Sequence, residues 1–290
     1  MADSRGRTPT GAGRVTRWLR VRWALVVVLS VVVVGWAVPA ATTERVAGHP
    51  SPVELATDVF TSGMATPRDG DDGLWLSWSL VDTARDRQVG SPNSDTDRTN
   101  SESSIKAWIA ADYLRVAHEE GRALTGAERA DIAAAVRRSD NAAAGRLYRE
   151  LGGDAILSHL RAVCGVAVAT STPGYWSLTQ ISAVDATRIF ACVLRTAPGL
   201  PGGDDLLTDL RSVEPDDAFG IKAALPPTAA VALKNGWMPH TTTGQWNVNC
   251  VAAWDEYVLA VLTRYPVDRP LSYGADVCRD VTAAVVGRLG

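Results

Sequence analysis

Three short motifs with reactive residue types occur in order along the chain. Residues 103–106 have the form S-x-x-K, residues 139–141 read S-D-N, and residues 234–236 (K-N-G) approximate K-T-G. Residues i and i+3 of a helix lie on one face, so the first motif brings an amine to a hydroxyl. An alcohol beside an unprotonated amine is a nucleophile with its base.

The lysine of the first motif must lose its proton near neutral pH to act as a base. Burial and a second nearby cation both lower a lysine pKa, and Lys234 is a candidate for that cation. Arginine cannot be deprotonated and could not replace Lys106 in this role. The chain has only three lysines, Lys106, Lys222 and Lys234, and two of them stand in the motifs.

Each motif also has a purely structural interpretation. The serines within 101–104 are suitable helix caps. Residues 139–141 also fit a break between two helices, and residues 235–236 a two-residue hairpin turn. Pro239 argues against that turn because proline resists pairing in a strand, so residues 239–244 are the better turn candidate. The combination of all three motifs favours a catalytic site over the structural interpretation.

The surrounding pattern predicts one mixed α/β (α+β) domain, in which an early strand joins a late antiparallel sheet. We expect a loop at 91–100, where turn-forming residues gather. Hydrophobic periodicity and capping residues predict strands at 74–81, 228–237, 245–254 and 257–264, and helices at 52–60, 105–118, 125–138, 142–151, 154–163, 182–194, 204–211 and 274–289.

The N-terminal 38 residues are typical of an export segment. Six arginines within residues 1–22 precede an uncharged run at 23–38. A basic segment of this kind stays on the cytoplasmic side. The run is short for a spanning helix of about 20 residues and long for a signal-peptide core of about 7–15. A signal anchor and a cleaved signal peptide both remain open, with 39–67 as a linker.

Composition and cysteines agree with an extracytoplasmic protein, either membrane-anchored through residues 23–38 or secreted. Of 290 residues, 46% are hydrophobic, and the net charge of −3 argues against a nucleic-acid partner. The four cysteines all follow the apolar run. Cys164–Cys192 and Cys250–Cys278 are the simplest pairing in an oxidising compartment. Four buried free thiols are the alternative.

The three motifs together resemble the class A β-lactamase and penicillin-binding-protein superfamily of serine hydrolases. The resemblance covers roughly residues 70–290, and we assign the domain to 68–290. It implies a β-lactamase/transpeptidase-like fold, an antiparallel sheet flanked by helices plus an all-helical half. No metal or other cofactor is implied.

The resemblance also implies a role for each motif residue. Ser103 is the expected nucleophile, Lys106 its base, and Ser139 the relay that passes a proton to the departing amine. The main-chain N–H groups of Ser103 and Trp237 would form the oxyanion hole. The expected substrate-binding residues are Asn141, Lys234, Asn235, Gly236 and Trp237. We also expect Tyr175 and Trp176 as cleft walls and Trp108 in the core.

Three departures from the family pattern affect the expected activity. The stretch between the first two motifs is short, which should trim the helical half. Asn235 stands where threonine or serine is usual. The stretch 170–180, which corresponds to the loop that carries the deacylating glutamate in class A enzymes, contains no acid. Glu150 and Glu214 are not placed to substitute for it, so deacylation by water should be slow.

We therefore expect an exported serine hydrolase or acyltransferase. It would form an acyl-serine with a β-lactam or with a cell-wall peptide such as a peptidoglycan stem peptide, and would release it slowly. If the acyl-serine persists, the protein would be a penicillin-acylated sensor. The alternative is a non-catalytic envelope binding module with the same fold.

Overall fold

The computed structural model describes residues 58–289, which belong to one compact unit. The predictions for 1–22 and 23–38, and most of the linker at 39–67, lie outside the described residues. Within the described part, no helix is both long and apolar enough to cross a bilayer. The first described helix, α1, spans Val59–Ser62, and the buried Val59 donates its N–H to the carbonyl of Arg288.

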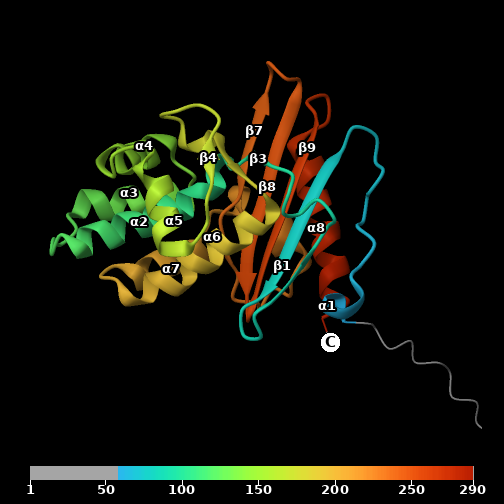
Figure 1. The fold of residues 1–290 in the computed structure, drawn as a ribbon, viewed down its shortest axis with the longest axis horizontal. Helices are drawn as coiled ribbons and strands as arrows, with labels where there is room; N and C mark the ends of the chain where they lie inside the picture. The colour runs from blue at the N-terminus through green and yellow to red at the C-terminus, as the bar shows by residue number, and fades with distance from the viewer. Residues whose placement is uncertain (1–57, 290) are drawn as a thin grey trace, which may run out of the picture. The chain divides into compact units, whose positions relative to one another are not determined.

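The main sheet is antiparallel and joins strands from both ends of the domain (Figure 1). Its order is β2-β1-β9-β8-β6, and β7 also pairs with β8. The strands are β1 (Trp75–Asp82), β2 (Arg87–Gly90), β6 (Ala232–Leu233), β7 (Gly236–His240), β8 (Gln245–Trp254) and β9 (Tyr257–Pro266). The early strand β1 lies against the late strand β9, which confirms the predicted topology.

A smaller sheet connects the start of the helical half to the loop before α6. It has the order β3-β5-β4, with β3 at Thr99–Asn100, β4 at Ala169–Thr170 and β5 at Thr179–Ile181. The main helices are α2 (Lys106–Glu119), α3 (Gly126–Arg137), α4 (Asn141–Glu150), α5 (Ala155–Cys164), α6 (Ala183–Thr196), α7 (Gly203–Arg211) and α8 (Leu271–Val286). A short 3-10 turn at Glu102–Ile105 leads into α2.

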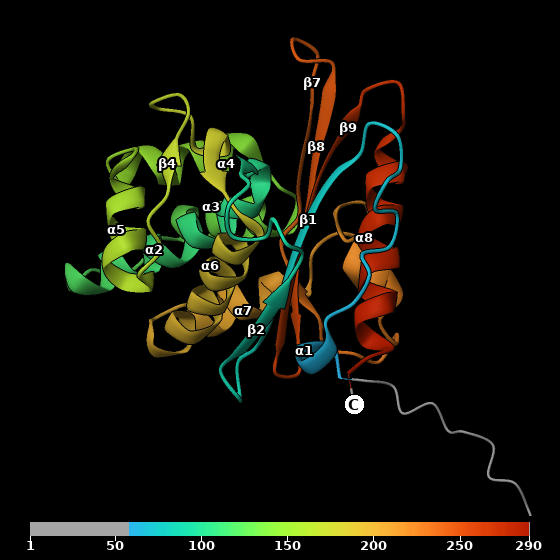
Figure 2. The ribbon, with the colours of Figure 1, turned by 45° about the vertical axis from the view of Figure 1, so that its right-hand side comes forward.

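Helices cover the two faces of the main sheet in different ways (Figure 2). Helix α8 packs on one face. Helix α6 packs on the other face against β1, β8 and β9, and α7 contacts β6. Strand β8 shows why both faces are apolar. Its Val248 and Cys250 join the core under α8, whereas Val251 and Ala253 join the core of the helical half. Alternate residues of a strand point to opposite faces.

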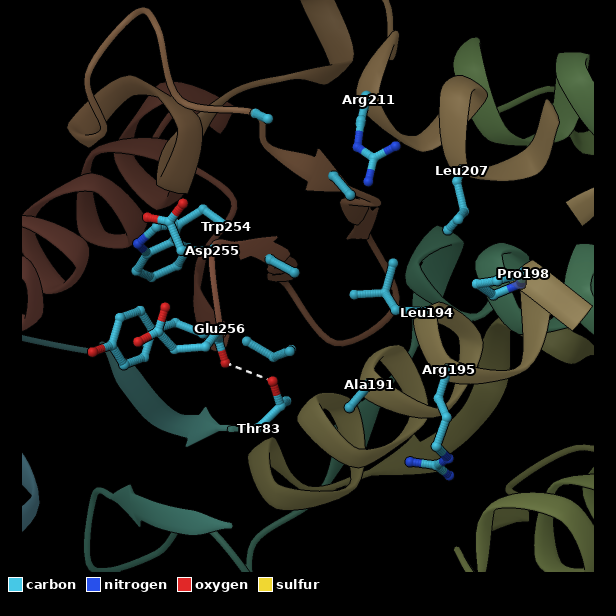
Figure 3. A pocket seen from close by; sticks show the side chains of 15 residues that line it. Thr83, Ala191, Leu194, Arg195, Pro198, Leu207, Arg211, Trp254, Asp255 and Glu256 are labelled. Atoms are coloured by element: carbon cyan, nitrogen blue, oxygen red, sulfur yellow. Dashed lines mark hydrogen bonds between the residues drawn. The ribbon is translucent and has the colours of Figure 1, made fainter. Parts of the chain in front are cut away.

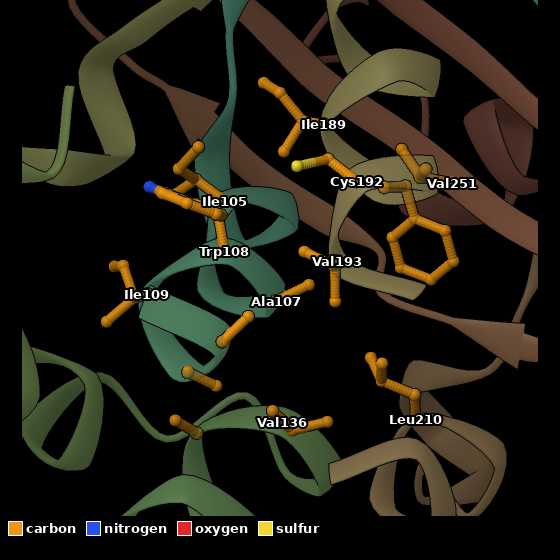
Figure 4. Close-up of a cluster of buried hydrophobic side chains, with 14 of the residues drawn as sticks. Ile105, Ala107, Trp108, Ile109, Val136, Ile189, Cys192, Val193, Leu210 and Val251 are labelled. Atoms are coloured by element: carbon orange, nitrogen blue, oxygen red, sulfur yellow. The ribbon is translucent and has the colours of Figure 1, made fainter. Parts of the chain in front are cut away.

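Helix α2 runs through the middle of the helical half. Its residues Ala107, Trp108 and Ile109 are fully buried, and Trp108 donates its indole N–H to the carbonyl of Ile156. Figure 4 shows this helix between Val136 of α3 and the side chains of α6. Trp108 is thus a core residue, as predicted. A helix surrounded on all sides holds the residues at its N-terminus in fixed positions.

The predicted strand at 228–237 is wrong, because the chain forms two short strands there. Strand β6 ends at Leu233, residues 234–235 lie between the strands, and β7 begins at Gly236. The prediction for Pro239 is also wrong, since it lies within β7 opposite Trp246. Strand β7 pairs only with β8, and a proline is tolerated where its missing N–H faces an open edge. The turn itself occupies residues 241–244.

Both predicted disulfides are present. Cys164–Cys192 joins the end of α5 to α6, and Cys250–Cys278 joins β8 to α8. Each links two elements of the fold across a sequence separation of 28 residues.

Candidate active site

A cleft of about 430 Å³ lies between the helical half and strand β7. Its lining includes three of the expected catalytic and substrate-binding residues, Ser103, Asn141 and Trp237. The loop 174–178 supplies a wall that contains Tyr175 and Trp176, as predicted.

Lys106, the first residue of α2, is fully buried beside this cleft. Its Nζ donates to the main-chain carbonyl and the hydroxyl of Ser139, the latter at 3.3 Å, and to Oδ1 of Asn141 at 2.7 Å. It also lies 4.9 Å from the ring centre of Trp176. The first two motifs are therefore in direct contact.

The surroundings of Lys106 lower its pKa to about 7. Burial is the largest cause, because it disfavours the charged amine. The neighbouring cation Lys234 lowers the pKa further, while the carboxylates of Asp140 and Asp217 oppose both effects. A substantial fraction of Lys106 is therefore a neutral amine near pH 7.

Lys234 completes a row of polar groups that centres on Ser139. Its Nζ donates to Ser139 Oγ at 3.0 Å and to the carbonyl of Asn235 at 3.1 Å. Burial lowers the pKa of Lys234 to about 8, against the opposing effect of Asp217. Ser139 has a φ of 52°, a left-handed conformation that is unusual for a residue with a side chain and recurs at functional sites.

Ser103 lies in the 3-10 turn that precedes α2 and is partly exposed to the cleft. Within residues 58–289 its Oγ has no hydrogen-bond partner, so the expected contact with Lys106 Nζ is not formed in this structure. Catalytic hydrogen bonds are often longer in unliganded enzymes and shorten on substrate binding.

The two asparagines of the motifs differ in what they can offer a ligand. Asn141 is exposed at the start of α4, and its Oδ1 accepts from Lys106, which orients the amide. Asn235 is buried, and its Nδ2 donates to the carbonyls of Asp217 and Phe219. Both N–H bonds of Asn235 are thus engaged with main chain, and its amide has none left in this structure for a substrate carboxylate.

Gly236 allows strand β7 to touch the turn that carries Ser103. A Cβ at position 236 would lie 2.6 Å from the main-chain nitrogen of Ser103, which no real side chain tolerates. The next residue is Trp237, whose ring packs edge-on against Phe219. The main-chain nitrogens of Ser103 and Trp237 consequently lie in two segments that are in direct contact.

Comparisons with known proteins test the fold. No family model matches the sequence. The chain is 26% identical over 220 residues to the protein named "Putative lipoprotein LppW" of Mycobacterium tuberculosis H37Rv, which covers 70% of this chain and 68% of that protein. The Mycobacterium bovis protein of the same name matches equally.

Solved structures with similar folds include class A β-lactamases. The enzyme from Mycobacterium abscessus superposes with a TM-score of 0.58 at 22% identity, over 75% of this chain and 94% of the enzyme. An ancestral (GNCA) class A β-lactamase gives 0.58 at 22% identity, over 75% and 95%. L2 complexed with relebactam gives 0.61 at 20% identity, over 75% and 92%. The chain has the class A β-lactamase fold.

Within this β-lactamase-like fold, the structure adds one carboxylate that the sequence analysis missed. Among the described residues that line the cleft, only Glu102 carries a carboxyl group. It immediately precedes Ser103 in the sequence, and this position beside the expected nucleophile could have identified it as a site residue. An acid in a first helical turn is usually explained by the helix dipole alone. The loop 170–180 supplies no acid.

A second, larger cavity of this protein, of about 710 Å³, lies where β8 turns into β9. Figure 3 shows Leu194 and Leu207 on its helical side and Trp254 and Glu256 on its sheet side. None of the motif residues lines it. The smaller cleft is therefore the candidate active site, because the reactive groups converge there. Within the described residues, no group of three or more His, Cys, Asp or Glu side chains is suited to hold a metal ion.

Proposed function

We propose that this protein forms an acyl-serine at Ser103 with a β-lactam or a cell-wall peptide and releases the acyl group slowly. The observation that carries this proposal is the convergence of Lys106 Nζ and Lys234 Nζ on the hydroxyl of Ser139. Burial of both amines at a cleft that also contains Ser103 is costly for stability, and a neutral lysine in this position serves as a general base.

Acylation begins with the proton of Ser103. Neutral Lys106 accepts it while Oγ attacks the substrate carbonyl, and the developing oxyanion accepts hydrogen bonds from the N–H groups of Ser103 and Trp237. The carbon–nitrogen bond then breaks. Ser139 donates its proton to the departing nitrogen and regains one from protonated Lys106, through the 3.3 Å contact.

Substrate binding uses the groups that remain free. Asn141 offers its amide N–H to a substrate carbonyl, since only its oxygen is occupied by Lys106. A substrate carboxylate would bind near Lys234 and Ser139. We assign Asn235 to holding the segment 217–219 against the strand end, in place of its expected role in substrate binding.

Slow release follows from the lack of a suitable carboxylate. The loop 170–180 has none. Glu102 is only 4% exposed, and its Oε1 already accepts from His240 and Asn247. A base for deacylation must hold a water molecule, and a carboxylate that is buried to this extent has little access to one. The acyl-enzyme should therefore accumulate.

The disulfides and the N-terminal sequence support an extracytoplasmic location. Structural disulfides persist in oxidising compartments, and this domain contains two. We propose that residues 23–38 direct export and either anchor the protein or are removed.

Labelling with a fluorescent penicillin tests the proposed reaction. Purified domain is incubated with the reagent and examined by intact-mass spectrometry, with Ser103→Ala as the matched control. We expect one adduct on the wild type and none on the control. A folded wild type that acquires no adduct would refute the proposal.

The second candidate function is a non-catalytic envelope binding module. It is favoured by the missing hydrogen bond between Ser103 and Lys106 and by the engagement of the Asn235 amide. In that case a β-lactam or peptide would stabilise the wild type and Ser103→Ala equally in thermal melts, with no covalent mass change in either. Any adduct at Ser103 excludes this function.

A further inference from the structure

Glu102 has an unusual conformation and an unusual set of partners. Its φ is 48°, which is unfavourable for a residue with a Cβ, and its side chain is buried beside the nucleophile. Backbone strain of this kind persists only where the surroundings enforce it. Here the contacts of the Glu102 side chain are candidates for this role.

The carboxylate of Glu102 is bound by two neighbouring strands. Its Oε1 accepts a hydrogen bond from Nε2 of His240 in β7 at 2.7 Å, and another from Nδ2 of Asn247 in β8 at 3.2 Å. An ionised carboxylate only accepts, so Nε2 of His240 is the donor in this contact when Glu102 is ionised. Burial raises the pKa of Glu102, and the donors partly offset this.

These bonds act on the same segments that would form the oxyanion hole. Strand β7 touches the turn of Ser103 at its beginning, through Gly236, and again at its last residue, His240. Trp237 lies between these two points of contact. The ladder with β8 also holds β7, and the bond to His240 adds a direct contact between the end of this strand and the turn of Ser103.

We propose that Glu102 is a positioning residue whose bond to His240 holds β7 against the turn of Ser103. The bond thereby sets the spacing between the main-chain N–H groups of Ser103 and Trp237. This inference rests on the proposed function, because the spacing matters only if Ser103 is acylated. Misplacement by about 1 Å can cost about a hundredfold in rate, so a single side-chain bond can control acylation.

The test measures acylation rates over a range of fluorescent penicillin concentrations for the wild type, Glu102→Ala, Glu102→Gln, His240→Ala and the double alanine variant. We expect each single alanine variant to lower the maximal acylation rate about tenfold to a hundredfold, with little change in the half-saturating concentration. Glu102→Gln retains an acceptor oxygen and should recover most of the rate. The double variant should be no slower than Glu102→Ala, because that substitution already removes the bond to His240 together with the bond to Asn247.

Glu128→Ala is the matched control. Glu128 also accepts several hydrogen bonds, from Tyr113, Arg122 and Thr125, but it does not line the cleft. Its loss should lower the melting temperature and leave the acylation rate of the folded protein unchanged. If Glu102→Ala does not fold, His240→Ala still decides the matter, because His240 lies on the open strand and its side chain is 24% exposed.

The outcomes separate this inference from the function on which it rests. An unlabelled wild type refutes the proposed function. A labelled wild type with variants that acylate at its rate overturns the positioning role alone. Normal acylation combined with a longer-lived adduct in Glu102→Ala would also overturn it, since Glu102 would then act in deacylation.

Discussion

Lys106 and Lys234 share one acceptor, the hydroxyl of Ser139, at 3.3 and 3.0 Å. Two buried amines that both approach one hydroxyl cannot both remain charged without a cost in free energy. Burial lowers the pKa of each amine. Their convergence on Ser139 is the geometry on which the proposed acylation depends.

The acylation rate should have a narrow, bell-shaped pH dependence. The pKa of Lys106 is lowered to about 7, so the base becomes neutral, and the rate rises, as the pH passes upward through that value. The pKa of Lys234 is lowered to about 8, so the cation that binds a carboxylate is lost above it, and the rate falls. Stopped-flow labelling from pH 5.5 to 9.5 measures both limbs. A rate independent of pH over this range would contradict these roles.

Lys106→Arg should reduce acylation about a hundredfold to ten-thousandfold, because arginine keeps its charge and cannot take the proton of Ser103. The rate of adduct formation on intact protein measures this. Lys222→Arg is the matched control, since Lys222 is exposed and does not line the cleft, and it should label like the wild type. Equal labelling of both variants would exclude Lys106 as the base.

Gly236→Ala should slow acylation at least about a hundredfold by forcing β7 away from the nitrogen of Ser103. Gly145→Ala offers a contrast, because position 145 lies in α4 with open space around it. That change should stabilise the protein by about 1 kcal/mol and leave acylation unaltered. Labelling kinetics and thermal melts compare the two. Unchanged labelling of Gly236→Ala would show that this close approach is not needed.

Removal of the Cys250–Cys278 disulfide, by replacing both cysteines with alanine, should lower the free energy of unfolding by about 3–4 kcal/mol. The estimate follows from the loop that the bond closes, with a sequence separation of 28 residues. Urea denaturation measures the change. The acylation rate of the folded variant should be preserved, because neither cysteine lines the cleft. A loss below about 1 kcal/mol would mean that the disulfide contributes little.

The sequence by itself determined the order and type of most elements and some of the residues that line the cleft, among them Ser103, Asn141 and Trp237. Helix α3 was predictable because Thr125 and Glu128 form a capping box that depends only on local spacing. The cysteine pairing was predictable because the simplest arrangement joins neighbours along the chain. The fold class followed from an early strand of alternating polarity, a run of helices and a group of late strands before a last helix.

The tertiary structure alone decided what the site residues can do. The lowered pKa of Lys106 depends on burial and on Lys234, which is 128 positions away along the chain. The break between β6 and β7, the engagement of Asn235 and the bond between Glu102 and His240 also come from distant segments. Local patterns encode torsion angles and amphipathic faces, whereas charge states and hydrogen-bond partners are set by long-range packing.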